Sequence, residues 1–190
     1  MDPGQHSSRA LHLDEVGLDA SEATLAEARA LLLEYGSFVI AQPGAARFCF
    51  GTLEQEAARL PLSFIEQGGG CLMAHVAAVP AGFIAWRAMP ATVAPDAWEL
   101  KRLWVRTVAR GLNLGRTLTQ AVLDRAVAAG KRAVYLDTAP ASMAAAHRLY
   151  LEMGFVPCPA YNDNPVEGLV WLVKRLDPKS FAEWATPEAK

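Results

Sequence analysis

The sequence has few cysteines and histidines, and their spacing matches no common disulfide or metal framework. The three cysteines lie far apart and are odd in number, and none of the four histidines forms an H-x-x-x-H or Cys/His pair. The cysteines are Cys49, Cys71 and Cys158. We therefore expect buried, reduced thiols and no bound metal.

An excess of charge of either sign is also lacking. Lysine and arginine together number 18 against 20 for aspartate and glutamate, so the formal net charge is −2. This balance excludes a strongly basic surface for nucleic acid and an acidic disordered tail. We expect the partner to be a small molecule and not a nucleic acid.

Long apolar runs are absent, with one near exception. The first ten residues are polar and lack the apolar segment of a secretory signal, so we expect a cytoplasmic protein. Residues 71–89 approach the length of a membrane span, but His75, Pro80, Gly82 and Arg87 interrupt them, and the central Val-Pro-Ala-Gly is a turn signal. We predict a hairpin of two buried strands there and no membrane association.

The length of 190 residues and the hydrophobic content of 52% suit one domain with a sizeable core. We expect this domain to span residues 1–176, with a loose start at 1–8 and a C-terminal tail at 177–190. Periodicity predicts helices at 21–35, 53–60, 114–129 and 142–153. Strands are predicted at 9–13, in the hairpin, and at 98–105, 133–138, 155–157 and 169–174. This order indicates an α/β or α+β sheet covered by helices.

Some helix boundaries carry specific signals. Thr24 and Glu27 have capping-box spacing for the first helix, and Gly36 is placed to end it. Gly130 is placed to end the third helix, and Ser142 has the side chain of an N-cap for the fourth.

Residues 108–118, VARGLNLGRTL, lead from a predicted strand into a predicted helix through Gly111 and Gly115. The spacing fits neither a G-x-x-x-x-G-K-[ST] phosphate loop nor a G-x-G-x-x-G dinucleotide motif. Free N–H groups and the positive dipole end at the helix start nevertheless favour an anion. Five basic residues fall between positions 101 and 116, and no acid follows before Asp124, which indicates concentrated positive charge. The alternative is a tight turn with solvated arginines.

Three segments in order resemble the GNAT superfamily of acyl-CoA-dependent N-acetyltransferases. Residues 110–115, RGLNLG, fit the pyrophosphate-loop pattern [RQ]-x-x-G-x-[GA] except at Asn113, where Gly is usual. Residues 99–105, ELKRLWV, resemble the fourth strand, and residues 144–155, AAAHRLYLEMGF, resemble the helix that ends in L-Y-x-x-x-G-F. The resemblance covers residues 98–174.

The resemblance implies a mixed, mostly antiparallel seven-stranded sheet flanked by helices, with strands four and five splayed apart. Acetyl-CoA is the implied acyl donor, its pantetheine arm paired along strand four and its pyrophosphate held by the loop. The implied contacts are Leu103, Trp104, Val105, Arg110, Gly111, Leu112, Asn113, Leu114, Gly115 and Arg116. If the loop needs a positive φ at Asn113, asparagine tolerates it and can also cap the next helix. Met143 stands where many members carry an asparagine that contacts the cofactor arm.

Two side chains have catalytic roles in this resemblance. Glu99 occupies the position of a general base that deprotonates the amine, often through water; its alternative is an exposed strand-end carboxylate paired with Lys101 or Arg102. Tyr150 occupies the position of the general acid that protonates the departing thiolate; its alternative is an aromatic anchor between helix and sheet.

The acceptor side is less specific. Tyr161, Asn162, Asp163 and Asn164 offer an aromatic edge and oxygen acceptors for an amine, although Asn-Asp-Asn-Pro is also a good turn. Arg87 with Trp86 is a weaker candidate, for a substrate carboxylate. We predict transfer of an acetyl group to a primary amine of a small molecule. A non-catalytic acyl-CoA-binding regulator and a protein lysine or N-terminal acetyltransferase are the alternatives, and a homodimer stays open.

Overall fold

The structure, a computed structural model, describes residues 10–42 and 50–176. Seven strands form one sheet in the order β1-β2-β3-β4-β5-β7-β6. Every neighbouring pair is antiparallel except β4 and β5, which run parallel. The strands are β1 (Leu11–Glu15), β2 (Gly70–Val76), β3 (Val79–Ala88), β4 (Ala97–Val105), β5 (Ala133–Thr138), β6 (Val156–Cys158) and β7 (Val170–Arg175). The predicted mixed, mostly antiparallel sheet is confirmed.

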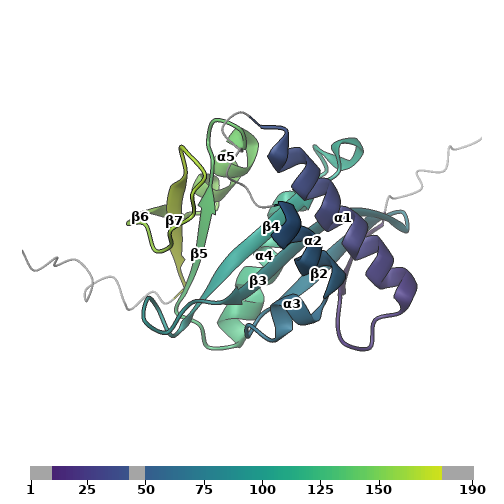
Figure 1. The fold of residues 1–190 in the computed structure, drawn as a ribbon, viewed down its shortest axis with the longest axis horizontal. Helices are drawn as coiled ribbons and strands as arrows, with labels where there is room; N and C mark the ends of the chain where they lie inside the picture. The colour runs from purple at the N-terminus through teal and green to yellow at the C-terminus, as the bar shows by residue number, and fades with distance from the viewer. Residues whose placement is uncertain (1–9, 43–49, 177–190) are drawn as a thin grey trace, which may run out of the picture.

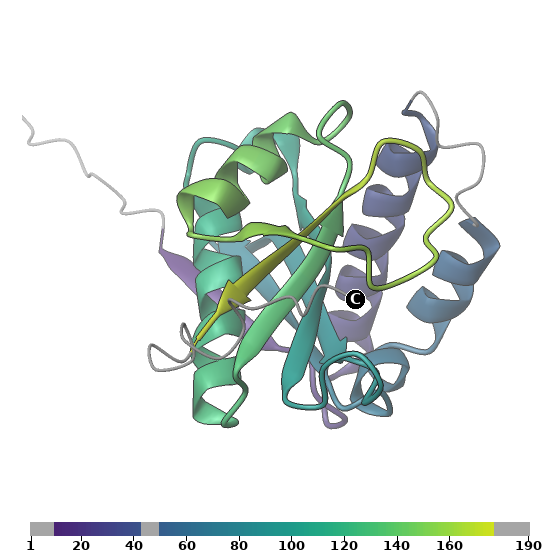
Figure 2. The same cartoon turned by 90° about the vertical axis from the view of Figure 1, so that its left-hand side faces the viewer.

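Helices cover both faces of the sheet (Figures 1 and 2). One face carries α1 (Glu22–Ile40), α2 (Phe50–Ala58) and α3 (Leu62–Ile65), and the other carries α4 (Leu114–Ala128) and α5 (Ala144–Glu152). A short 3-10 turn, η2 (Thr107–Ala109), leads from β4 toward α4. No helix among residues 10–42 and 50–176 is long and apolar enough to cross a membrane.

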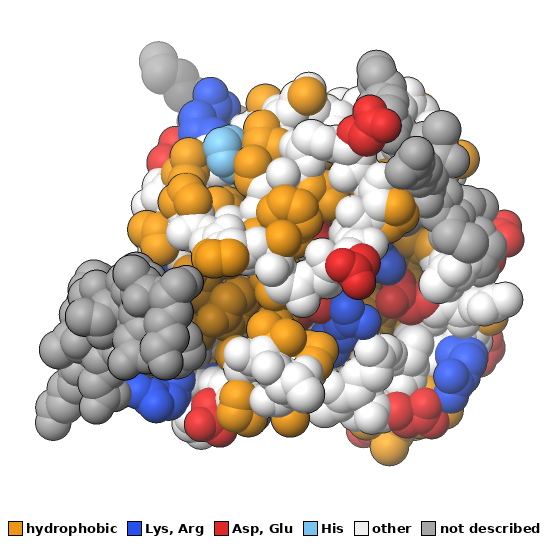
Figure 3. All heavy atoms as spheres, turned by 60° about the vertical axis from the view of Figure 1, so that its left-hand side comes forward, with side chains coloured by type: hydrophobic (Ala, Val, Ile, Leu, Met, Phe, Trp, Pro, Cys, Tyr) orange, Lys and Arg blue, Asp and Glu red, His pale blue; other side chains and the backbone are white. Residues whose placement is uncertain are grey.

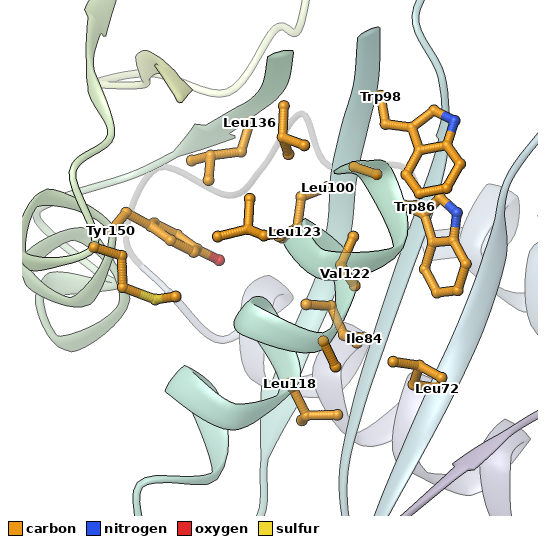
Figure 4. Packing of buried hydrophobic residues seen from close by; sticks show 14 of the residues in the cluster. Leu72, Ile84, Trp86, Trp98, Leu100, Leu118, Val122, Leu123, Leu136 and Tyr150 are labelled. Atoms are coloured by element: carbon orange, nitrogen blue, oxygen red, sulfur yellow. The ribbon is translucent and has the colours of Figure 1, made fainter. Parts of the chain in front are cut away.

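Two hydrophobic clusters lie on opposite faces of the sheet because successive strand side chains alternate between them. On β3, Phe83 and Ala85 belong to the cluster under α1, α2 and α3, whereas Ile84 and Trp86 belong to the cluster under α4. Figure 4 shows the second cluster, in which Leu118 and Val122 of α4 face the strands. These clusters fix the strands whose ends form the site.

Helix α1 differs from the prediction at both ends. Its N-cap is Ser21, whose hydroxyl accepts a hydrogen bond from the Thr24 N–H (3.1 Å), so the capping box predicted at Thr24 and Glu27 is wrong. Gly36 does not end the helix either, because it is buried within a helix that continues to Ile40. Burial of Val39, which is 6% exposed, extends α1 past the glycine.

Helix α5 starts later than predicted, and α4 ends as predicted. The N–H groups of Ser142 and Met143 donate to the Ala139 carbonyl (3.1 and 2.7 Å), so both residues lie in a turn and Met143 occupies the N-cap. The N-cap predicted at Ser142 is therefore wrong. After α4, Gly130 has a φ of 69° and the Lys131 N–H donates back to the Ala126 carbonyl, which ends the helix.

Strands β2 and β3 form the predicted hairpin, but its turn lies elsewhere. Ala77 and Ala78 make the turn with φ values of 51° and 64°, and Val-Pro-Ala-Gly at 79–82 lies within β3. The register shift at Ala74 and His75 accommodates Pro80, which lacks an N–H for the ladder. The turn signal marked the hairpin and misplaced its centre.

Candidate active site

Strands β4 and β5 pair briefly and then part. Parallel pairing ends with Glu99 opposite Tyr135, whereas β4 continues to Val105 with no β5 partner among the described residues. A cavity opens between them, lined by residues of α1, β4, β5, α5 and the loop before β7. Its lining includes Tyr35, Leu100, Lys101, Asp137, Tyr150 and Asn164. The predicted splaying of these two strands is confirmed.

Beyond Glu99, β4 has a backbone edge that faces β5 without pairing with it, and its side chains point to the two faces of the sheet. Leu103 lines the cavity and packs on the cluster under α4. Trp104 packs toward α1, where its Nε1 donates to Glu34 Oε2 (3.1 Å). Val105 pairs with Gly82 of β3, so the edge of β4 that faces β5 stays accessible to the backbone of a ligand.

Glu99 lies at the point where the strands part and is 1% exposed. Arg87 Nε donates to its Oε2 (2.6 Å), while Lys101 Nζ and the Tyr161 hydroxyl donate to its Oε1 (3.1 Å each). The alternative is therefore right about the pairing with Lys101 but wrong about exposure, because the carboxylate is buried. Arg102 instead pairs with Glu56 (2.8 Å). A base role for Glu99 stays a prediction.

Tyr150 extends from α5 toward Leu123 and Leu100 in the core (Figure 4). It is 4% exposed, lines the cavity and meets Phe155 edge-on at 5.6 Å between ring centroids. Burial is the main cause that raises the pKa of its hydroxyl, so the group stays protonated at neutral pH. Tyr150 therefore both packs against Phe155 as an anchor of α5 and lines the cavity.

The loop before α4 has the backbone of an anion site. Gly111 has a φ of 82° and Asn113 a φ of 63°, and the first helical hydrogen bond runs from the Thr117 N–H to the Asn113 carbonyl (3.1 Å). The N–H groups of residues 114–116 precede that bond and are available to an anion. The backbone thus has the positive φ that asparagine tolerates, but the Asn113 side chain makes no capping hydrogen bond.

Gly115 serves close packing. A Cβ placed there would lie 3.2 Å from Leu149 Cδ2 of α5, so the glycine lets α4 approach α5 beside the cavity. Gly111 differs, because a Cβ there would meet nothing within 4 Å and its positive φ is the reason for glycine.

Four of the five basic residues pair with acids, one from β4 itself and three from other elements, which corrects the expectation of concentrated positive charge. The pairs are Lys101 with Glu99, Arg102 with Glu56, Arg106 with Glu34 and Arg116 with Glu152. Arg110 instead lies over the Trp104 ring, 5.7 Å from its centroid. In Figure 3, acidic and basic side chains lie together among hydrophobic and uncharged atoms and form no single-sign field.

The loop before β7 crosses from the β5 side of the sheet toward α1 and α2 (Figure 2). Tyr161 reaches Glu99 as described, while Asn162 and Asn164 donate to Asp137 Oδ2 (2.9 and 3.2 Å). Asp163 lines a separate open pocket with Tyr161. The structure thus brings three of the four predicted acceptor residues to the carboxylates of β4 and β5.

Asp137 was missed in the sequence, where it stands as a single acid within the apolar strand pattern AVYLDT. That acid in a buried strand was the signal that could have identified it. Met143, which stands where many members of the family carry an asparagine, lines the cavity, and its Sδ lies 4.0 Å from Thr138 Oγ1. Trp86 is 4% exposed and packs on Trp98, so its ring lies in the core.

The thiols agree in part with expectation. Cys71 is buried, and burial raises its pKa to about 12. Cys158 is partly buried, and Cys49 lies outside the described residues. Within residues 10–42 and 50–176, no group of three or more His, Cys, Asp or Glu side chains is placed to hold a metal ion.

Comparison with solved structures shows the same fold in several acetyltransferases. A GNAT-family acetyltransferase of Staphylococcus aureus superposes with a TM-score of 0.67 at 15% identity, over 88% of this chain and 100% of that one. A putative acetyltransferase of Salmonella typhimurium, solved with its cofactor acetyl-CoA, gives 0.62 at 19%, over 95% and 99%. An N-acetyltransferase of Thermoplasma acidophilum in complex with coenzyme A gives 0.66 at 14%, over 87% and 99%.

Sequence comparison adds a family assignment. An uncharacterised N-acetyltransferase of Schizosaccharomyces pombe is 35% identical over 78 residues, 41% of this chain, and the match spans about half (47%) of that relative. The profile of the acetyltransferase (GNAT) family matches residues 38–155. Because that match covers more than half of the length, the chain belongs to the GNAT family of acetyltransferases.

Proposed function

We propose that this protein moves an acetyl group from acetyl-CoA to a primary amine of a small molecule. The parting of β4 and β5 beside Tyr150 carries this proposal, because Leu103, which lines the opening, lies next to the start of α4: a Cβ placed at Gly115 would be 4.0 Å from Leu103 Cδ2. The first turn of α4 has N–H groups that can bind an anion. A coenzyme A thioester needs both features: a slot for its narrow arm and N–H donors for its pyrophosphate. The acetyl-CoA and coenzyme A complexes of the Salmonella and Thermoplasma proteins support the same ligand here.

The residues present fit that ligand. The backbone N–H groups of residues 111–116, with Arg110 beside them, would hold the pyrophosphate, and the unpaired edge of β4 at residues 103–105 would receive the amide groups of the arm. Because four neighbouring basic side chains already have acidic partners, we expect backbone donors to supply most of the binding.

The chemistry needs a neutral amine. An alkylammonium with a pKa of ~10.4 is roughly 0.1% neutral at pH 7, which costs about 4–5 kcal/mol before attack. We propose that its proton passes to Glu99. Glu99 is 1% exposed and accepts hydrogen bonds from Lys101 and Tyr161. The proton therefore reaches Glu99 through water or through the Tyr161 hydroxyl.

In the transfer itself, the amine nitrogen forms a bond to the thioester carbonyl carbon and the carbon–sulfur bond breaks. The Tyr150 hydroxyl gives its proton to the departing thiolate, so the products are an N-acetyl amide and free coenzyme A. Because burial raises the pKa of Tyr150, its hydroxyl is protonated at neutral pH when the thiolate forms. The tyrosinate then regains a proton from solvent or from the released amine proton.

A small acceptor is favoured by the loop before β7. Asn164, Val166 and Glu167 line the cavity together with Tyr35 and Val39 of α1. The acceptor therefore enters between a helix and a loop, which suits a small amine better than a folded protein surface.

Release of free thiol from acetyl-CoA, followed with the full chain over a panel of amines, amino acids and peptides, tests the proposal. We expect turnover on small amines, and a fall in kcat of about 10²- to 10⁴-fold for Glu99→Gln and for Tyr150→Phe. Glu22→Gln, exposed at the start of α1, is the matched control and should turn over normally. Binding without turnover on any acceptor favours the regulator, turnover on peptides alone favours protein acetylation, and no acyl-CoA binding overturns the proposal.

A further inference from the structure

We propose that Asp137 of β5 binds the ammonium group of the acceptor. This inference rests on the proposed function and adds the residue that recognises the charged form of the amine. Its carboxylate lines the same cavity as Tyr150 and Leu103, between the parted strands, and its side chain is 12% exposed. An amine that enters this cavity therefore meets Asp137.

The carboxylate is held so that one oxygen stays available. Asn162 Nδ2 and Asn164 Nδ2 both donate to Oδ2 (2.9 and 3.2 Å), and Lys101 Nζ lies 3.8 Å from the same oxygen. Within the described part of the chain, no hydrogen bond or ion pair ends on Oδ1. The two amides thus fix the plane of the carboxylate and leave Oδ1 to accept from a ligand N–H.

Glu99 is a poorer partner for an ammonium group. Both of its oxygens already accept hydrogen bonds, from Arg87, Lys101 and Tyr161. It is also 1% exposed, against 12% for Asp137. The two carboxylates therefore divide the work: Asp137 receives the cation, and Glu99 accepts its proton.

The charge state of Asp137 agrees with binding. Burial acts to raise its pKa, but Lys101, the amides of Asn162 and Asn164, and the charge of Arg102 outweigh burial and lower it. Asp137 is therefore ionised at neutral pH. A carboxylate with a lowered pKa is a weak base, so it pairs with an ammonium group without removing the proton.

A purely structural role is the alternative, since Asp137 also anchors the loop that carries Asn162 and Asn164. Three variants separate the two roles. Asp137→Asn removes the charge but keeps a carbonyl oxygen for the loop amides, Asp137→Glu keeps the charge, and Asn162→Ala loosens the loop while the carboxylate stays.

The test is calorimetric titration of n-butylamine and of aniline into the full chain saturated with coenzyme A at pH 7. Butylamine is an ammonium ion at this pH and aniline is neutral. We expect Asp137→Asn to weaken butylamine binding about 10- to 100-fold, to leave aniline binding within about twofold, and Asp137→Glu to restore part of the loss. Coenzyme A affinity and thermal midpoint, measured alongside, should stay near those of the wild type.

Equal butylamine affinity in the wild type and Asp137→Asn, no binding of butylamine by the wild type, or an equal loss in Asn162→Ala would each overturn the assignment. This readout is independent of catalysis. Absence of thiol release by the wild type would instead count against the proposed function, so the two failures are distinguishable.

Discussion

Asn113 holds the turn before α4 in the left-handed region, with a φ of 63°, and its side chain makes no capping hydrogen bond. Asparagine adopts this conformation at small cost, whereas a β-branched residue does not. We therefore expect Asn113→Gly to leave acetyl-CoA affinity within about twofold and Asn113→Val to weaken it about tenfold or more. Isothermal titration of acetyl-CoA into the three proteins checks this. A large gain in affinity for Asn113→Gly would mean that asparagine weakens the site.

Single residues show where sequence reasoning reached the site and where it stopped. Glu99 was identified by its position before the loop motif, and Tyr150 by the L-Y-x-x-x-G-F ending of its helix. Glu99 lies where the strands part, and Tyr150 lines the cavity that opens there. Asp137 had no such motif, and its importance comes from Asn162 and Asn164, which are distant in sequence. Side-chain partners across a fold leave no periodic pattern, so the pairs that Arg102, Arg106 and Arg116 make with distant acids were also out of reach, unlike the local pair of Lys101 with Glu99.

At the scale of elements, Glu34 ties α1 to β4. Its carboxylate accepts from Arg106 Nη2 (2.6 Å) and from Trp104 Nε1 (3.1 Å). The hydrogen bond from Arg106 is the main cause that lowers the pKa of Glu34 from its ordinary value of 4.5. Because the folded-state pKa is the lower one, the carboxylate stabilises the fold above pH 4.5, and this contribution is lost as pH falls through the folded-state pKa.

Glu34→Gln should therefore lower the free energy of unfolding at pH 7 by less than about 1 kcal/mol, since the side chain is 38% exposed. Urea denaturation at pH 7 and at progressively lower pH measures the difference in free energy of unfolding between the wild type and Glu34→Gln. This difference should become smaller below pH 4.5. Glu22→Gln, which removes a pair with Arg29 within α1, is the matched control, and its free energy of unfolding should differ less from that of the wild type. If Glu34→Gln lowered the free energy of unfolding by the same amount at every pH, the loss would not come from the ion pair.

Element boundaries followed from sequence where local backbone chemistry decides them. Gly130 ends α4 as predicted because its positive φ closes the helix locally. Gly36 failed as a stop signal because burial of Val39 against the sheet continues α1 through it. The hairpin turn moved to Ala77 and Ala78 because strand register, set by the core, overrode the turn preference of Pro80 and Gly82.

At the scale of the whole molecule, the sequence predicted the seven strands and helices α1, α2, α4 and α5, but not α3 or η2. The resemblance added a mixed sheet with strands four and five splayed, and neither predicted the order of the strands in the sheet. Strand β7 inserts between β5 and β6, and β4 meets β5 in parallel, which chain order alone does not reveal. The parallel pairing of β4 with β5 matters for the site, because residues at the C-terminal ends of both strands line the same cavity. Topology therefore creates a site from segments that are separate in the chain.

Ligand binding to that site should stabilise the whole fold, because acetyl-CoA binds the native state and not the unfolded chain. At 100 times its Kd, acetyl-CoA adds about 2.7 kcal/mol to the free energy of unfolding, which raises the thermal midpoint of a protein of this size by about 5–10 °C.

Gly111 and Gly130 provide a matched pair to test this, since both have positive φ (82° and 69°) and open space at Cβ. We expect Gly111→Ala and Gly130→Ala to lower the midpoint similarly, through about 1–2 kcal/mol of backbone strain. Only Gly111→Ala should lose most of the shift induced by acetyl-CoA in thermal denaturation, because only Gly111 belongs to the loop that would hold the pyrophosphate. An equal ligand-induced shift in both variants would remove this loop from the cofactor site.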